Sequence, residues 1–181
     1  MVAANDGVDN DWRVGHNDLT DDEYYEGFAK INLSSLYTCY TINSATFNIY
    51  KTSLSNYPGN NDIKIRFGTF NGDPVSDSWN TIHNNINNMV TEYARYGWNN
   101  SSTTYSGFLP DPFGNNSNTA GWFNMTASAT DVASRIGQGY INIGSDDMIE
   151  DGWSGSLSDD SYWLNFMGAR GNANQPYLAV N

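Results

Sequence analysis

The chain has 181 residues, which suits one domain with a substantial core, and we expect a single domain over residues 1–181. Its formal net charge is −12, with 8 Lys and Arg against 20 Asp and Glu, so the composition argues against nucleic acid and anionic membranes as partners. No apolar run is long enough to cross a bilayer, and we expect no membrane insertion. About one residue in seven is Asn and 14% are aromatic, a mixture typical of an all-β domain with long loops.

Alternation of apolar and polar residues with a period of two predicts strands along most of the chain. The most distinctive stretch is 25–50, which predicts two strands joined by a polar connection, their apolar faces anchoring one sheet. Those faces consist of Ala29, Ile31, Leu33, Ala45, Phe47 and Ile49. The expected strands are 12–15, 27–33, 45–50, 63–69, 91–98, 120–125, 138–143, 162–167 and 176–180.

Two short helical segments interrupt the strands. Apolar residues recur at helical spacing between Ile82 and Tyr93, which predicts one or two helical turns followed by a strand. A second short helix is expected over 131–136, with Ser128 or Thr130 as its cap.

Three segments lack alternation and are dense in Asn, Ser, Gly and Asp, so we expect long loops at 53–62, 99–118 and 146–160. Loops of this length in a sandwich often bind ligands. The edge strand 176–180 can pair internally or be lent to a neighbour, which leaves a homo-oligomer open.

Several motifs follow one another in a fixed order. They are Asp11-Trp12-Arg13-Val14-Gly15, the strand pair at 25–50, Ser78-Trp79-Asn80, Gly121-Trp122-Phe123-Asn124-Met125-Thr126, Tyr162-Trp163-Leu164-Asn165-Phe166 and Pro176-Tyr177-Leu178-Ala179-Val180. Together they resemble the disaggregatase-related (DNRLRE-type) β-sandwich domains. They are also similar to jelly-roll modules of phage structural proteins and of carbohydrate-binding regions in secreted polysaccharide-degrading enzymes. The name-giving motif is absent, and 84–113 departs from the pattern. The resemblance implies an antiparallel jelly-roll-like β-sandwich with one or two short helical turns and long loops.

Catalytic motifs are weak in this sequence. His16 and His83 lie in unrelated contexts without the spacing of metal ligands. The segment Gly152-Trp153-Ser154-Gly155-Ser156 does not have the spacing of a nucleophile elbow. No Asp or Glu stands out in a hydrophobic setting suited to a glycosidase pair. We therefore expect a protein that is not an enzyme.

Acidic clusters are better candidates for metal binding than for catalysis. Asp6, Asp9 and Asp11 lie close together in the sequence and offer the hard oxygen ligands that Ca²⁺ prefers. Clusters at 18–23 and 146–151 could bind a metal in the same way, and none has the spacing of an EF-hand. The alternative is solvated acidic loops that maintain solubility. The single Cys39 cannot form an internal disulfide, so stability must come from packing or a bound ion.

Aromatic residues in loops predict glycan binding, because the apolar face of a sugar ring stacks on Trp or Tyr. Tyr96, Trp98 and Tyr105 flank an Asn-rich loop, and Trp153 lies in a Gly-, Ser- and Asp-rich loop. The alternative is that these rings fold back over the edge of the sandwich. The tryptophans within or beside strand patterns are expected to pack in the core or between sheets; they are Trp12, Trp79, Trp122 and Trp163.

Three hypotheses for function follow. The first is a non-catalytic structural or adhesion module on a virion exterior, as capsid decoration, fibre or tail component, with neutral glycans or other virion or surface proteins as partners. The second is a carbohydrate-binding or adhesion domain from a secreted or cell-surface protein. The third is a polysaccharide-degrading enzyme. We favour the first because the chain starts at Met with almost nothing before the domain.

Overall fold

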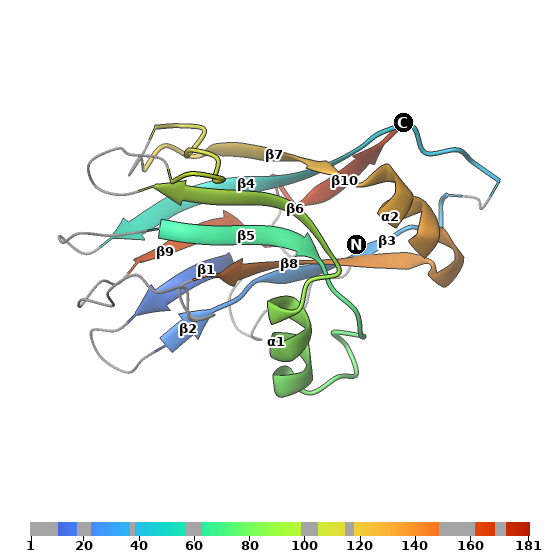
Figure 1. Cartoon of the computed structure of the whole chain (residues 1–181), viewed down its shortest axis with the longest axis horizontal. Helices are drawn as coiled ribbons and strands as arrows, with labels where there is room; N and C mark the ends of the chain where they lie inside the picture. The colour runs from blue at the N-terminus through green and yellow to red at the C-terminus, as the bar shows by residue number, and fades with distance from the viewer. Residues whose placement is uncertain are drawn as a thin grey trace.

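The computed structural model describes residues 11–17, 23–36, 39–56, 63–98, 105–114, 118–148, 162–168 and 173–181. Within them, antiparallel strands form two sheets packed face to face, which confirms the predicted all-β sandwich (Figure 1). The strands are β1 (Asp11–Asn17), β2 (Glu23–Tyr25), β3 (Phe28–Asn32), β4 (Ala45–Asn56), β5 (Ile63–Thr69), β6 (Thr91–Trp98), β7 (Gly121–Ala127), β8 (Tyr140–Asp147), β9 (Tyr162–Met167) and β10 (Tyr177–Val180). The helices are α1 (Trp79–Asn87), α2 (Ala129–Arg135) and the 3₁₀ helix η1 (Ile136–Gln138).

The strand order is that of a jelly roll. One sheet has the order β3-β8-β5-β6, and the other has β10-β4-β9-β1-β2, with β7 also paired to β4. The pairs β5 with β6, β4 with β7, β3 with β8 and β1 with β9 are nested within one another along the chain. Such nesting arises when one long hairpin is rolled into two facing sheets. The β10 strand is paired internally, with residues 45–48 of β4.

The two strands of the distinctive 25–50 stretch lie in different sheets, so the prediction that their apolar faces anchor one sheet is wrong. β3 belongs to the four-stranded sheet and β4 to the six-stranded sheet. Ala29 and Ile31 of β3 and Phe47 and Ile49 of β4 are all buried in the same core, which both sheets share. Periodicity identifies the buried face of a strand but does not tell which sheet the strand joins.

The core between the sheets is rich in aromatic residues. Phe67 of the four-stranded sheet meets Phe166 of the other sheet with ring centroids 5.6 Å apart and planes at 89°. Tyr96 of the four-stranded sheet likewise meets Phe123 of the other sheet edge to face, at 4.9 Å. Burying each such side chain contributes about 1.5–3 kcal/mol, so these contacts hold the two sheets together.

Helix α1 packs on the outer face of the four-stranded sheet. Ile82 and Ile86 form a small buried cluster with Phe28 and Phe70, and the Ser78 hydroxyl caps the helix by accepting from the amide of Thr81 at 3.3 Å. The predicted helical turns are confirmed. Trp79, which was expected in the core, is 49% exposed because α1 buries its isoleucines instead.

Helix α2 lies at one end of the sandwich (Figure 1). It begins at Ala129, two residues earlier than predicted, and Ser128 accepts from the amide of Asp131 at 3.2 Å. The helix places Val132 in the main core. The predicted short helix is confirmed, and of the two candidate caps, Ser128 and Thr130, the cap is Ser128.

A network of polar side chains lies buried between the sheets. Asp147 of β8 contacts Nδ1 of His16 through Oδ2 at 2.6 Å, and its Oδ1 accepts from the hydroxyl of Tyr162 at 2.8 Å. The same hydroxyl accepts from the backbone amide of Lys64 at 3.2 Å. These contacts join β1, β5, β8 and β9 across the sandwich, and we call His16, Asp147 and Tyr162 the inter-sheet network.

The boundaries of two predicted loops are wrong. Residues 53–56 continue β4, and residues 146 and 147 are the last two of β8. Asp146 faces outward but is fully buried, and its carboxylate accepts from Nε of Arg66 at 2.6 Å. In the sequence, Asp146 and Asp147 end the alternation of apolar residues. In the structure each of them has a polar partner, so β8 continues through both positions.

Removing the hydroxyl of Tyr162 tests the inter-sheet network. We expect Tyr162→Phe to lower the free energy of unfolding by about 1–3 kcal/mol, since it leaves an oxygen of Asp147 without its buried donor. Urea unfolding followed by tryptophan fluorescence measures this loss. Tyr177→Phe is the control, because Tyr177 is 43% exposed and should change stability by less than about 0.5 kcal/mol. Equal stability of the two variants would contradict the role of the network.

Alkaline pH should destabilise the fold. Burial, followed by the charge of Asp147, raises the pKa of Tyr162 well above its usual 10.0. In the unfolded chain this tyrosine ionises near pH 10, whereas in the folded protein it stays neutral. Its contribution to the free energy of unfolding is therefore full below about pH 10 and declines as the pH rises towards the folded pKa. Burial and then Asp111 raise the pKa of Tyr96 to about 12, which acts in the same direction.

Urea unfolding at increasing pH above 10 should therefore give a falling free energy of unfolding, by about 1.4 kcal/mol per pH unit for each such tyrosine. Tyr162→Phe should show a shallower decline than the wild type. An identical decline in the two proteins would mean that Tyr162 is not protected from ionisation.

Candidate functional site

Aromatic rings gather on the outer face of the six-stranded sheet. Tyr50 of β4 lies directly opposite Trp122 of β7, and their ring centroids are 5.2 Å apart with planes at 74°. The ring of Tyr177 on β10 also contacts Trp122, with ring centroids 5.4 Å apart and planes again at 74°. Edge-to-face contacts of this kind are favourable for aromatic pairs. Trp122 is therefore held between two tyrosines, and none of the three is buried in the core.

A second aromatic pair lies on the same face, over β1. Trp163 of β9 and Tyr25 of β2 are both opposite Gly15, which lies on β1 between them. The two rings meet edge to face, with their centroids 5.8 Å apart and their planes at 60°. Gly15 has φ 136°, and a Cβ there would collide with the carbonyl oxygen of Tyr162. Only glycine fits this position, and the pair depends on it.

Amides and hydroxyls surround the aromatic rings. Asn124 and Thr126 of β7 follow Trp122 on the outward side and are exposed. Nδ2 of Asn165 on β9 donates to the hydroxyl of Ser53 on β4 at 2.9 Å. These groups both donate and accept hydrogen bonds, as sugar hydroxyls do. We call this surface the aromatic face and define it by its rings, Tyr25, Tyr50, Trp122, Trp163 and Tyr177.

Among the side chains that the structure describes, the aromatic face carries little charge, although the protein has a net charge of −12. Among the outward side chains of this sheet that the structure describes, Arg13 is the only charged one, and its guanidinium lies 5.7 Å from the ring centroid of Tyr25. Acidic side chains lie elsewhere, for example on β8 and in α2. The face therefore suits a neutral ligand better than an ionic one.

Two of the predicted glycan-binding residues are buried. Trp98 is 0% exposed and Tyr96 is 3% exposed, both in the main core. They alternate with Arg95 and Gly97 on β6, so both rings face the opposite sheet. This corrects the prediction for these two residues, because a buried ring has no face to offer a sugar.

Tyr105 is half-buried at the end of the Asn-rich segment. Nζ of Lys64 lies 4.4 Å from its ring centroid, and Phe108 contacts it edge-on at 6.2 Å. One face of the ring is thus occupied by a cation from β5. Trp153 lies outside the described residues, so its part in glycan binding stays a prediction.

The predicted calcium ligands lie at the start of the chain. Asp6 and Asp9 are outside the described residues, and Asp11 is the first residue of β1. In the described part of the chain, no group of three or more His, Cys, Asp or Glu could hold a metal ion. The alternative cluster at 146–151 loses two members, since Asp146 pairs with Arg66 and Asp147 belongs to the inter-sheet network.

The calcium prediction at Asp6, Asp9 and Asp11 can be tested by thermal unfolding. If these carboxylates hold Ca²⁺, added calcium should raise Tm and EGTA should reverse the increase, because a ligand that binds only the native state stabilises it. Asp9→Asn should abolish the response. A Tm that is indifferent to calcium in the wild type would contradict the prediction.

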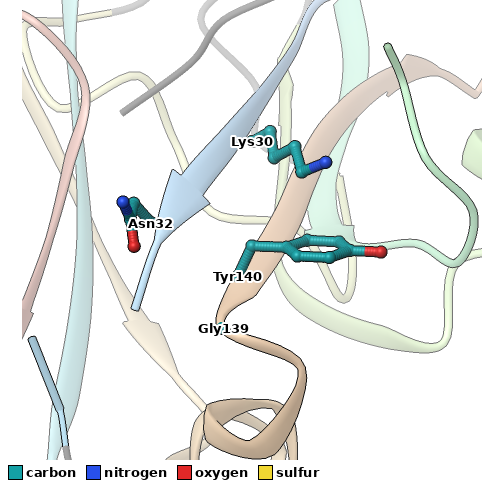
Figure 2. A pocket seen from close by; sticks show the side chains of 4 residues that line it. All are labelled: Lys30, Asn32, Gly139 and Tyr140. Carbon is teal, nitrogen blue, oxygen red and sulfur yellow. The ribbon is translucent and has the colours of Figure 1, made fainter. Parts of the chain in front are cut away.

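A small pocket opens beside α2, between the ends of β3 and β8. It has a volume of about 180 Å³ and is lined by Lys30, Asn32, Gly139 and Tyr140 (Figure 2). Nζ of Lys30 lies 4.1 Å above the ring of Tyr140 and also donates to Asp73 at 2.8 Å. The pocket is smaller than the roughly 300–1,000 Å³ typical of small-molecule sites, and its cation is already paired. The aromatic face is the stronger candidate.

The alternation of residues along β7 and β9 indicates the aromatic face, although the sequence motifs do not. Trp122 alternates with Phe123 and Met125, which are buried, so the tryptophan must point outward. Trp163 alternates in the same way with Tyr162 and Leu164. The assignment of Trp122 and Trp163 to packing within the sandwich followed their place in strand patterns rather than this phase. Both are half-buried on the outer surface.

No family model matches this chain, and no curated protein matches it. The resemblance to DNRLRE-type domains therefore stays a prediction. Among the described helices, none is long and apolar enough to cross a membrane.

Proposed function

We propose that this chain is a non-catalytic structural or adhesion module displayed on a virion exterior, as a capsid decoration, fibre or tail component, and that it binds neutral glycans through the aromatic face. The observation that carries the glycan proposal is the position of Trp122 between Tyr50 and Tyr177 on the outer surface of the sheet. Aromatic rings stack on the apolar faces of sugar rings, while neighbouring amides and hydroxyls bind the sugar hydroxyls.

The extent of the face favours an oligosaccharide over a single sugar. Trp122 lies on β7 and Trp163 on β9, with β4 between the two strands. Strands lie about 4.8 Å apart and rise about 3.4 Å per residue, which puts the two aromatic groups on the order of 20 Å from each other. A chain of several sugars could therefore contact both groups at once, with Asn165 and Ser53 between them.

The second candidate is a carbohydrate-binding or adhesion domain of a secreted or cell-surface protein. It uses the same face and the same chemistry, and differs only in where the module is displayed. Neighbouring genes distinguish the two contexts, since capsid and tail genes support the virion and secreted hydrolases support the second candidate.

The glycan proposal is tested by binding to an array of neutral glycans, followed by titration calorimetry with the best ligand. We expect Trp122→Ala to weaken binding at least about ten-fold, a loss of about 1.4 kcal/mol, because it removes the central stacking surface. Thermal unfolding should confirm that the variant remains folded.

The matched control is Trp79→Ala. Trp79 is also exposed, at 49%, but it lies on α1 over the other sheet, so its removal should leave glycan affinity unchanged. If Trp122→Ala bound as tightly as the wild type, the aromatic face would not be the binding site. If the wild type bound no neutral glycan, the chain would have a purely structural role.

A further inference from the structure

An ion pair lies fully buried within the sandwich. Nζ of Lys51 on β4 is 2.7 Å from Oδ2 of Asp111, which belongs to the connection between β6 and β7, and both side chains are 0% exposed. A lysine in a protein core is unusual, and none of the contacts that we assign to glycan binding uses it.

The fold brings these two residues together through a glycine. Lys51 follows Phe47 and Ile49 in the inward phase of β4, so its side chain enters the core. Gly121 lies opposite Lys51 on β7, and a Cβ at Gly121 would collide with the ring of Phe113. Because Gly121 has no Cβ, the ring of Phe113 can pack against β7 at this position. The segment that contains Phe113 also contains Asp111, which then lies against Lys51.

Two phenylalanine rings line the buried pair. Nζ of Lys51 lies 5.1 Å from the ring centroid of Phe113 and 5.7 Å from that of Phe123. Separated charges are costly in such surroundings. Transfer of one proton from Nζ to Oδ2, across 2.7 Å, converts the ions into a free amine and a carboxylic acid. Those are the two reactants of amide formation.

The carboxyl group is also held in a fixed orientation. Its second oxygen, Oδ1, accepts from the backbone amide of Phe113 at 2.9 Å. An N–H aimed at this oxygen stabilises the negative charge that develops there when a nucleophile attacks the carboxyl carbon. The nucleophile, the carboxyl group and a stabilising donor are thus arranged in one closed site.

We propose that Lys51 and Asp111 form an intramolecular amide bond. Nζ attacks Cγ of Asp111 and forms the new N–C bond, while the carbonyl electron pair moves to Oδ1, beside the Phe113 amide. The electron pair then returns, the bond from Cγ to Oδ2 breaks, and the oxygen leaves as water with a proton supplied by Nζ. An amine and an acid become an amide and one water, with no oxidant or other reactant.

Such a bond would stabilise this fold in the way that a disulfide stabilises other proteins. It would tie the middle of β4 to a segment 60 positions away and restrict the unfolded chain. The sequence has a single cysteine, Cys39, so an internal disulfide is not available to it.

A second lysine and aspartate pair provides a matched control. Nζ of Lys30 lies 2.8 Å from Oδ1 of Asp73, nearly the same distance, but these side chains are 19% and 38% exposed. Water stabilises the two ions there, so this pair should remain an ion pair. The comparison separates the effect of burial from that of proximity.

The test is the intact mass of the purified, denatured wild-type chain. We expect a mass lower than that of the sequence by one water molecule. After digestion with trypsin, the chain should remain uncleaved after Lys51, and the peptide carrying Lys51 should be joined to the peptide carrying Asp111. Lys51→Met should have its full sequence mass, whereas Lys30→Met should still lack one water.

A wild-type mass equal to that of the sequence would overturn the proposal and leave a buried ion pair only. Loss of water that maps to the sequences Asp6-Gly7 or Asp151-Gly152 would also overturn it, because aspartate before glycine can lose water by cyclisation. If Lys51→Met failed to fold, the joined peptides of the wild type would decide the question alone.

Discussion

A charge buried between two sheets must be neutralised where it lies, and this constraint fixes much of the structure. An uncompensated buried charge costs several kcal/mol, comparable with the whole stability of a domain. Buried polar groups need partners as well, and Asp147 has two in Nδ1 of His16 and the hydroxyl of Tyr162, which fix β1 and β9 relative to β8. Lys51 meets the constraint through Asp111, which fixes the connection between β6 and β7 on β4. Apolar packing brings the sheets together, and these pairs determine how they are aligned.

The same pairing explains why the two outer surfaces differ. Asp146 binds Arg66 on the four-stranded sheet, whose outer face is partly covered by α1. Asp131 binds Arg135 within α2. At the outward positions of the six-stranded sheet that the structure describes, the side chains are mainly aromatic, amide and hydroxyl groups, with Arg13 as the charged exception. A strongly acidic chain thus has a group of aromatic rings with few described charges on one outer surface, which is the basis of the proposed glycan binding.

The sequence predicted strands and helices, which depend on neighbouring residues. It did not predict sheet membership or long-range contacts, which depend on residues far apart in the chain. The alternation of Ile63, Ile65 and Phe67 predicted β5 with its observed bounds. The assignment of β3 and β4 to one sheet was wrong because a local period carries no information on sheet membership. Tyr96 and Trp98 flank an Asn-rich loop in the sequence, but both take inward positions on β6 and are buried. The inward position of Lys51 could be read from β4, but its partner lies 60 positions away in an irregular segment.

Strand β4 connects the two proposals. Tyr50 points outward to Trp122, while the next residue, Lys51, points inward to Asp111. A ligand pulling on the aromatic face would therefore load β4, which is already held by β7, β9 and β10 through backbone hydrogen bonds. Hydrogen bonds along a strand can break one after another under such a load, whereas an amide at Lys51 breaks only as a covalent bond. If both proposals hold, a module that adheres through Tyr50 would gain mechanical resistance from the proposed covalent bond at the adjacent residue.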